Sequence, residues 1–170
     1  MKKQEVTHRA DETIVREVRD SDCDTIIEIF NYYAVSSYAA FPEIPVNDRF
    51  YAFLREGALG FNVLEHEAHI VGFGLMKLLL PFPAFMTTGI LTCFIQPEYT
   101  HNSLGKKLLD QLTDYAKKMG MTSLVANMAS KNRVSILFHT RHGFSEVGRL
   151  QGAGIKFGDL FDVILMQKIL

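Results

Sequence analysis

The sequence predicts an α/β fold. Segments with strand-like alternation or short apolar runs follow one another along the chain, and stretches with helical apolar spacing lie between them. In addition, a short helix that begins near Asn132 is expected to end at Gly143, and two apolar strands follow it. The length of 170 residues suits one domain, which buries roughly two thirds of its unfolded surface. We expect that domain over residues 13–170, after an N-terminal extension of residues 1–12.

The first third of the chain is predicted to contain one strand and two helices. The alternating segment 13–18 indicates the strand. Ser21 is positioned to cap the first helix, whose apolar side chains recur at helical spacing, and Asn47 to cap the second. Gly57 and Gly60 follow the second helix and are expected to end it.

The middle of the chain is predicted to form a hairpin, two further strands and a long amphipathic helix. The expected strands are residues 61–65, 69–79, 88–95 and 123–127, and the expected helix is 103–119. Pro97 stops the third of these strands, and Gly120 ends the helix, whose apolar side chains form one stripe.

Composition excludes several classes of protein. Hydrophobic residues make up 48% and charged residues 22% of the chain, as in soluble globular proteins. The formal net charge of −1 argues against a general binder of nucleic acid or of anionic membranes. The two cysteines, Cys23 and Cys93, have no spacing typical of a metal site or of a disulfide framework, so we expect no metal.

Membrane insertion and secretion are not expected either. The longest apolar run, residues 78–86, is short and contains Pro81 and Pro83, so it cannot span a bilayer. The first eleven residues mix charges without an apolar core, so we expect no signal peptide and a cytoplasmic location.

The C-terminal segment resembles that of the GNAT N-acetyltransferases. It reads Asn132-Arg-Val-Ser-Ile-Leu-Phe-His139, then His142-Gly-Phe144, Glu146-Val-Gly-Arg-Leu150, Lys156-Phe-Gly158 and Asp162-Val-Ile-Leu-Met-Gln167. From about Thr13 to Gln167 the pattern is similar to the branch that acetylates phosphinothricin and methionine sulfoximine. The resemblance implies a mixed, mostly antiparallel sheet of six or seven strands with helices on both faces. It also implies acetyl-CoA as co-substrate, a small-molecule amine as acceptor, a homodimer, and central strands that splay near Ile95 to admit the coenzyme.

The segment 96–107, QPEYTHNSLGKK, corresponds to the family's pyrophosphate loop. Backbone N–H groups and the dipole at a helix N-terminus attract phosphate, and glycines allow close approach. The family motif, Gln/Arg-x-x-Gly-x-Gly/Ala, spans Thr100 to Gly105 here and keeps only its last glycine. The resemblance implies coenzyme contacts at His101, Asn102, Ser103, Leu104, Gly105 and Lys106. Without the resemblance, the same residues describe an ordinary helix start capped by Asn102 or Ser103.

The strand before this loop is implied to hold the thioester and the pantetheine arm along Cys93, Phe94 and Ile95. Main-chain groups there would pair with pantetheine amides, and one N–H would polarise the thioester carbonyl. The branch carries a glutamate and a tyrosine at the positions of Ile90 and Phe94, so its usual proton acceptor is missing here. Cys93 is interpreted as a small buried hydrophobe and not as a nucleophile.

The helix after residue 131 carries two further candidates. Asn132 matches the family asparagine that contacts the coenzyme, and as a bare residue it is equally well an N-cap. His139 matches the histidine of the phosphinothricin branch and is implied to protonate the leaving thiolate or to relay a proton. The alternative is a helix histidine that packs against the sheet with one ring nitrogen satisfied.

The expected acceptor pocket is aromatic and apolar. Where the family has arginines around two prolines, this chain has Leu80, Phe82 and Met86. The loop before the second helix adds Tyr32, Tyr33, Tyr38 and Phe41. The alternative is that these residues fill a subunit interface. Two functions follow: an N-acetyltransferase for a small amine, or a degenerate module that binds acyl-CoA or an apolar ligand without turnover.

Overall fold

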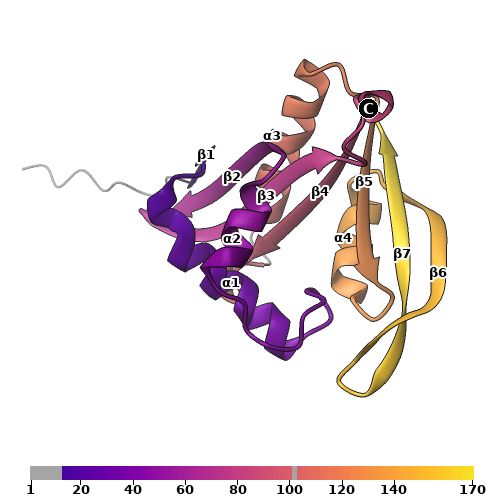
Figure 1. Cartoon of the computed structure of the whole chain (residues 1–170). Coiled ribbons are helices and arrows are strands. Elements are labelled where there is room, and N and C mark those ends of the chain that lie inside the picture. Colours follow the sequence, from indigo (N-terminus) through magenta and orange to yellow (C-terminus); the bar gives the residue numbers. More distant parts are fainter. Residues whose placement is uncertain (1–12, 101–102) are drawn as a thin grey trace, which may run out of the picture.

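The computed structural model describes residues 13–100 and 103–170, so the N-terminal extension, His101 and Asn102 lie outside the described residues. Within these ranges the chain forms a mixed sheet with helices on both faces, as predicted (Figure 1). The strands are β1 (Thr13–Glu17), β2 (Ala58–His66), β3 (His69–Leu78), β4 (Thr88–Ile95), β5 (Ser123–Ala129), β6 (Ser145–Lys156) and β7 (Asp159–Ile169). The α-helices are α1 (Cys23–Ser36), α2 (Asp48–Arg55), α3 (Leu104–Lys118) and α4 (Arg133–Arg141), and three short 3-10 turns are η1 (Asp20–Asp22), η2 (Pro83–Phe85) and η3 (Pro97–Tyr99).

The sheet changes character at the contact between β4 and β5. Its strand order is β1-β2-β3-β4-β5-β7-β6, and in the described ranges the neighbours are antiparallel except for β4 and β5. These two strands pair in parallel only from Thr88 to Ile90 of β4, opposite Ser123 to Val125 of β5. Beyond Ile90 they diverge, as Figure 1 shows. The predicted splay toward Ile95 is therefore present.

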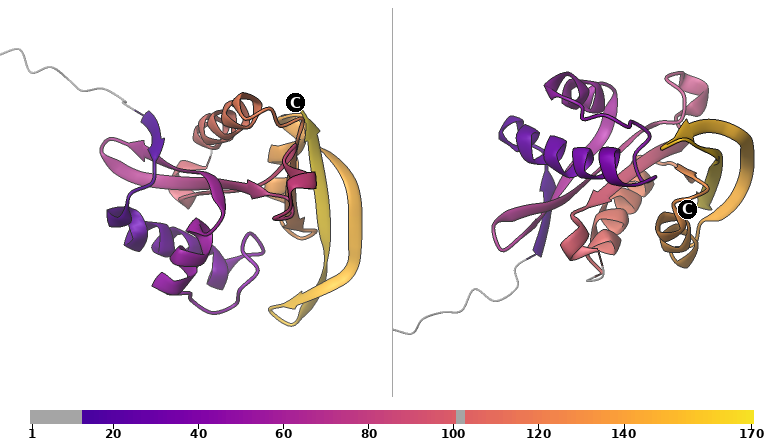
Figure 2. Two further views of the ribbon diagram at one scale, coloured as in Figure 1. Left: turned by 45° about the horizontal axis from the view of Figure 1, so that its top comes forward. Right: turned by 90° about the horizontal axis from the view of Figure 1, so that it is seen from below.

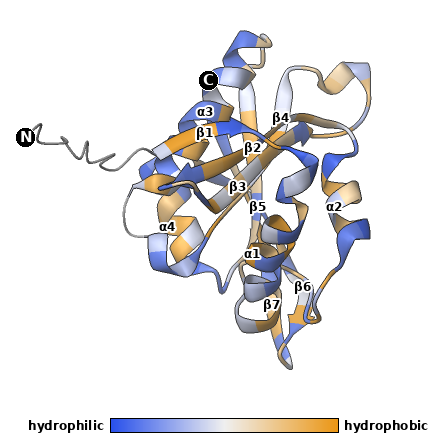
Figure 3. Cartoon of the chain, turned by 90° about the vertical axis from the view of Figure 1, so that its left-hand side faces the viewer, coloured by the Kyte–Doolittle hydropathy of each residue, from blue (hydrophilic) through white to orange (hydrophobic). Residues whose placement is uncertain are grey.

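The two faces of the sheet carry different helices. Helices α1 and α2 cover one face, and α3 and α4 cover the other (Figure 2). Hydrophobic residues are frequent along β2 and β3 (Figure 3). On the first face Phe30 of α1 packs with Phe73 and Phe94, and on the second Leu109 and Leu112 of α3 pack with Leu124. Apolar burial on both faces is the main force that holds such a layered sheet together.

Most helix boundaries follow the capping residues. The Asn47 side chain accepts a hydrogen bond from the Arg49 N–H, and Gly143 adopts a positive φ of 88° after α4, both as predicted. Ser21 does not cap α1, because residues 20–22 form the turn η1 and the helix starts at Cys23. The expectation that Gly60 ends α2 is wrong. Gly60 lies inside β2, where a Cβ atom would come within 3.2 Å of the Tyr115 ring of α3.

The apolar run of residues 78–86 connects β3 to β4 through the turn η2. Among the described residues, no helix is long and apolar enough to cross a membrane.

A buried lysine ties the β6–β7 hairpin to the loop between α1 and α2. Lys156 is only 1% exposed, and its Nζ donates hydrogen bonds to the carbonyls of Ser37 and Ala40, both at 2.6 Å. In return, the Tyr38 hydroxyl donates to the Lys156 carbonyl at 3.0 Å. Because buried backbone carbonyls need partners, the ammonium group fixes the course of this loop.

We predict that Lys156→Met lowers the free energy of unfolding by about 1–3 kcal/mol, because methionine fills similar space but leaves two carbonyls without a donor. Chemical denaturation at pH 7 measures the change. Lys131→Met is the matched control: Lys131 binds Asp159 at 2.7 Å on the surface, where an ion pair contributes about 0–1 kcal/mol. Equal losses in the two variants would contradict the structural role of Lys156.

Candidate functional site

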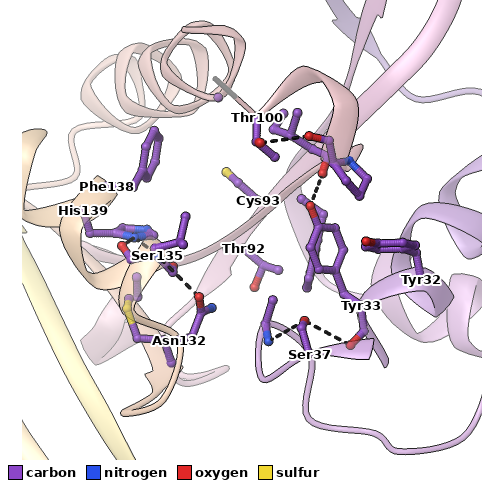
Figure 4. A pocket seen from close by; sticks show the side chains of 18 of the residues that line it. Tyr32, Tyr33, Ser37, Thr92, Cys93, Thr100, Asn132, Ser135, Phe138 and His139 are labelled. Carbon is purple, nitrogen blue, oxygen red and sulfur yellow. Dashed lines mark hydrogen bonds between the residues drawn. The ribbon is translucent and has the colours of Figure 1, made fainter. Parts of the chain in front are cut away.

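A cavity of about 460 Å³ lies where β4 and β5 diverge. Its walls come from α1, from the second half of β4, from the start of α3, from β5 and from α4. Figure 4 shows Tyr32 and Tyr33 of α1 on one side of this cavity, and Phe138 and His139 of α4 on the other. Cys93 of β4 lies between them.

The cavity collects about half of the residues expected to bind the coenzyme or to act in catalysis. Those that line it are Cys93, Phe94, Ile95, Gly105, Asn132 and His139. Among the other expected residues, Leu104 is buried in the core, Ser103 is exposed and Lys106 forms a surface ion pair with Asp110. His101 and Asn102 fall outside the described part of the chain.

Successive residues of β4 direct their backbone N–H and C=O groups alternately toward β3 and toward β5. The Gln96 N–H donates to the Val71 carbonyl of β3 at 2.7 Å. Since successive residues of a strand point their N–H and C=O groups to opposite sides, the backbone of Phe94 also pairs with β3. The backbone groups of Cys93 and Ile95 point the other way, toward the diverging β5. Phe94 therefore offers only its side chain to the cavity, contrary to the expectation that main-chain groups of all three strand residues hold the thioester and the pantetheine arm.

Tyr33 closes one end of this backbone edge. Its hydroxyl donates a hydrogen bond to the Ile95 carbonyl, and its ring lies 5.5 Å from that of Phe94 (Figure 4). Burial raises the pKa of Tyr33 to about 12, so the hydroxyl stays protonated at neutral pH. Tyr32 and Tyr33 were expected in the loop before the second helix, but both lie within α1, and no sequence signal indicated the backbone partner of Tyr33.

The Cys93 thiol lies in the cavity wall but is unsuited to nucleophilic chemistry. Burial raises its pKa to about 12, which leaves the thiol protonated at neutral pH. This agrees with the interpretation of Cys93 as a small hydrophobe.

The start of α3 approaches α4 closely. Ser103 precedes the helix in the left-handed region, with φ of 58°, and forms no side-chain cap. A Cβ atom on Gly105 would lie 3.3 Å from Cε2 of Phe138, so glycine permits the contact between the two helices. The first N–H groups of a helix have no partner within it, which makes this end a potential anion site beside the cavity.

Asn132 acts as the N-cap of α4. Its Oδ1 accepts a hydrogen bond from the Ser135 N–H at 3.2 Å. Asn132 therefore caps the helix and also lines the cavity.

His139 is a buried, neutral imidazole with one free nitrogen. It is 7% exposed, and its Nδ1 donates to the Ser135 carbonyl at 2.8 Å. Its Nε2 has no hydrogen-bond partner among residues 13–100 and 103–170. Burial lowers the pKa of His139, the hydrogen bond to Ser135 opposes this, and nearby His142 lowers it further. Nε2 therefore carries a lone pair at neutral pH, and this nitrogen is itself buried.

The expected acceptor pocket is only partly correct. Tyr32 and Tyr33 line the cavity, but Leu80, Phe82 and Met86 are exposed and lie outside its lining. Tyr38 and Phe41 instead pack against Phe161 of β7, with ring centroids 5.9 and 6.0 Å away.

The sequence did not predict several polar residues that line the cavity. They are Ser36, Ser37, Asn127 and Ser135, from three separate elements. The described part of the lining contains no Asp, Glu, Lys or Arg side chain. Nor does any cluster of three or more potential metal ligands occur in the described ranges.

Comparison with known proteins agrees with this arrangement. The chain is 28% identical over 157 residues to an L-methionine sulfoximine/L-methionine sulfone acetyltransferase of Salmonella typhimurium, covering 90% of this chain and 92% of the relative. It is 29% identical over 159 residues to a phosphinothricin N-acetyltransferase of Alcaligenes faecalis, covering 91% and 81%. A solved Salmonella typhimurium structure, which holds its cofactor acetyl-CoA, superposes with a TM-score of 0.83 at 27% identity over 94% of both chains.

The model of the acetyltransferase (GNAT) family matches residues 26–144. This match spans more than half of the chain and includes β4, α3, β5 and α4, which enclose the cavity. The chain therefore belongs to the acetyltransferase (GNAT) family.

Proposed function

We propose that this protein is an acetyl-CoA-dependent N-acetyltransferase of the phosphinothricin and methionine sulfoximine kind, with a small amine as acceptor. The carrying observation is the cavity at the β4–β5 divergence, which has an exposed strand edge, a helix N-terminus beside it and His139 in its lining. Both named relatives acetylate small molecules, which supports this class of acceptor.

Acetyl-CoA would lie along the edge of β4. Its pyrophosphate would meet the N-terminus of α3, where the backbone from Ser103 to Lys106 and the exposed Lys107 offer positive potential. The pantetheine amides would pair with the backbone of Cys93 and Ile95, and the cavity would hold the acetyl group.

The reaction would be a direct transfer. The amine nitrogen attacks the thioester carbonyl carbon, an N–C bond forms and the C–S bond breaks. A backbone N–H of β4 stabilises the negative charge on the carbonyl oxygen. His139 Nε2 accepts the proton that the nitrogen loses and then returns it to the departing thiolate, so no net proton is consumed.

The position of the branch's glutamate does not supply a second base. Ile90 is half-buried on the same face of β4 as Thr92, and Thr92 is the one of the two that lines the cavity. Neither side chain accepts a proton at neutral pH, so His139 is the proposed acceptor.

The alternative is a binding module without turnover, which the changes at Thr100, Ser103, Ile90 and Phe94 favour. Calorimetric titration with acetyl-CoA, followed by measurement of thiol release over an amine panel, separates the two. Binding together with amine-dependent thiol release supports the enzyme. Binding without any release supports the module.

Gly105→Val is predicted to weaken acetyl-CoA binding by roughly tenfold or more, because the added side chain collides with Phe138 at the cavity wall and overpacking costs about 1–3 kcal/mol. Calorimetry measures the affinity. Gln111→Val, on the exposed side of α3, is the control. It introduces the same β-branched residue into the helix, with the same loss of helix propensity, and should bind acetyl-CoA with the affinity of the parent. Unchanged affinity in Gly105→Val would remove this contact from the coenzyme site.

His139→Gln is predicted to lower kcat/KM by about 10²-fold or more, with little change in acetyl-CoA affinity, because glutamine cannot accept the proton. Since the pKa of His139 is lowered from 6.5, protonation of this histidine should reduce the parent's activity only below that pH. His142→Gln, one position past α4, is the control and should retain most activity. An unchanged rate in His139→Gln would exclude the histidine from catalysis.

We further propose a homodimer in which the β6–β7 hairpin contributes to the interface. β6 is an edge strand, and exposed apolar side chains gather on this hairpin: Val147, Leu150, Ile155, Phe157 and Leu160. Unpaired strand edges with exposed apolar residues tend to associate. The exposed residues Leu80, Phe82 and Met86 form a second possible contact.

Light scattering at micromolar concentration is predicted to give twice the chain mass of 19.3 kDa. Leu160→Arg should shift the protein toward monomer, because it places a charge directly opposite Ile155 on the hairpin. Phe53→Arg, at an exposed apolar site on α2, is the control and should stay dimeric. A monomeric mass for the parent rules the proposal out.

A further inference from the structure

The walls of the cavity are mostly apolar, and none of the described lining residues is charged. The described lining offers hydroxyls, amides and one neutral imidazole, but no Asp, Glu, Lys or Arg. The nearby cations have other partners: Lys156 donates to the carbonyls of Ser37 and Ala40, and Lys131 to Asp159. Lys77, opposite Ile90 on β3, donates to the Phe53 carbonyl at 2.8 Å. Glu28 and Glu98 line a second cleft, which shares Tyr32 and Pro97 with the cavity.

Binding of a charged acceptor in this cavity would therefore carry an unfavourable desolvation free energy. An amino acid brings a carboxylate and an ammonium group, and burial of either without a partner costs several kcal/mol. Among the described lining residues, neither a cation for the carboxylate nor an anion for the ammonium is present.

The proton acceptor imposes a second restriction. His139 has a pKa below its usual 6.5, so it cannot remove a proton from an alkylammonium group of pKa near that of lysine, about 10.4. At pH 7 less than about 0.1% of such an amine is neutral. An aromatic amine shares its nitrogen lone pair with the ring, so it is neutral at this pH and presents a nucleophile directly.

Aromatic side chains also shape the cavity walls. The Tyr32 ring is half-exposed and lies 5.2 Å from Tyr33, whose ring in turn lies 5.5 Å from Phe94. Phe138 lies on the α4 side (Figure 4). Such rings favour offset or edge-on contact with another flat ring.

We propose that the acceptor is an arylamine, an aromatic amine that is uncharged at neutral pH and carries no carboxylate. This inference rests on the proposed acetyltransferase function and names its substrate class. The amine nitrogen forms the bond to the acetyl carbon as the C–S bond breaks. One N–H proton moves to His139 Nε2 and then to the thiolate, so the products are an N-aryl acetamide and free CoA. No oxidant, reductant or metal takes part in this balance.

The test compares three amines of similar size with acetyl-CoA and the full chain. 4-Methylaniline and benzylamine are isomers that differ in the basicity of the nitrogen, and phenylglycine adds a carboxylate to the benzylamine frame. Thiol release and mass detection of the acetylated product give kcat/KM. At pH 7 the value for 4-methylaniline should exceed that for benzylamine by about 10²-fold or more, as expected when only a minute fraction of benzylamine is neutral.

The site residue is tested with Tyr32→Ala. Loss of the aromatic wall should raise KM for 4-methylaniline by roughly 2- to 10-fold and leave kcat and acetyl-CoA affinity nearly unchanged. Phe53→Ala removes an exposed aromatic ring away from the cavity and should behave as the parent.

The outcomes are distinct. Preference for 4-methylaniline supports the proposal. Preference for benzylamine or phenylglycine at pH 7 overturns the arylamine assignment but leaves the acetyltransferase function intact. Acetyl-CoA binding without product from any of the three amines overturns both.

Discussion

The short parallel contact between β4 and β5 is the constraint on which the site depends. Three residue pairs join the strands, and divergence beyond Ile90 leaves the Cys93 and Ile95 backbone without a strand partner on that side. An unpaired strand edge inside a protein is costly unless something else satisfies it. Tyr33 does this for the Ile95 carbonyl, and the cavity leaves the neighbouring groups accessible. The same divergence that shortens the contact between the two strands thus leaves an accessible strand edge in the cavity.

The sequence predicted those helix boundaries that depend only on neighbouring residues. The Asn47 and Asn132 caps and the positive φ of Gly143 depend only on neighbouring residues, so the sequence indicated them directly. Gly60 was misassigned because its role comes from Tyr115, more than fifty positions away, which packs where a side chain would project. Ser21 failed as a cap because a 3-10 turn precedes α1.

The resemblance implied Cys93 and Ile95 on β4 and His139 on α4 as site residues, and all three line the cavity. The pairing direction that removes the Phe94 N–H depends on the register with β3, which no local pattern encodes. Ser37 and Asn127 reach the cavity through tertiary folding alone, and the arginine-replacing residues Leu80, Phe82 and Met86 lie outside it.

The resemblance places a glutamate at Ile90 and arginines around Leu80, Phe82 and Met86, but none of these four residues lines the cavity. The absence of charged side chains from its described lining is therefore a property of the residues that form the cavity itself. What remains is an imidazole whose Nδ1 is fixed by Ser135 and whose Nε2 is free among the described residues. The arylamine proposal follows from these features, because the described lining offers no side chain that would pair with a charged acceptor.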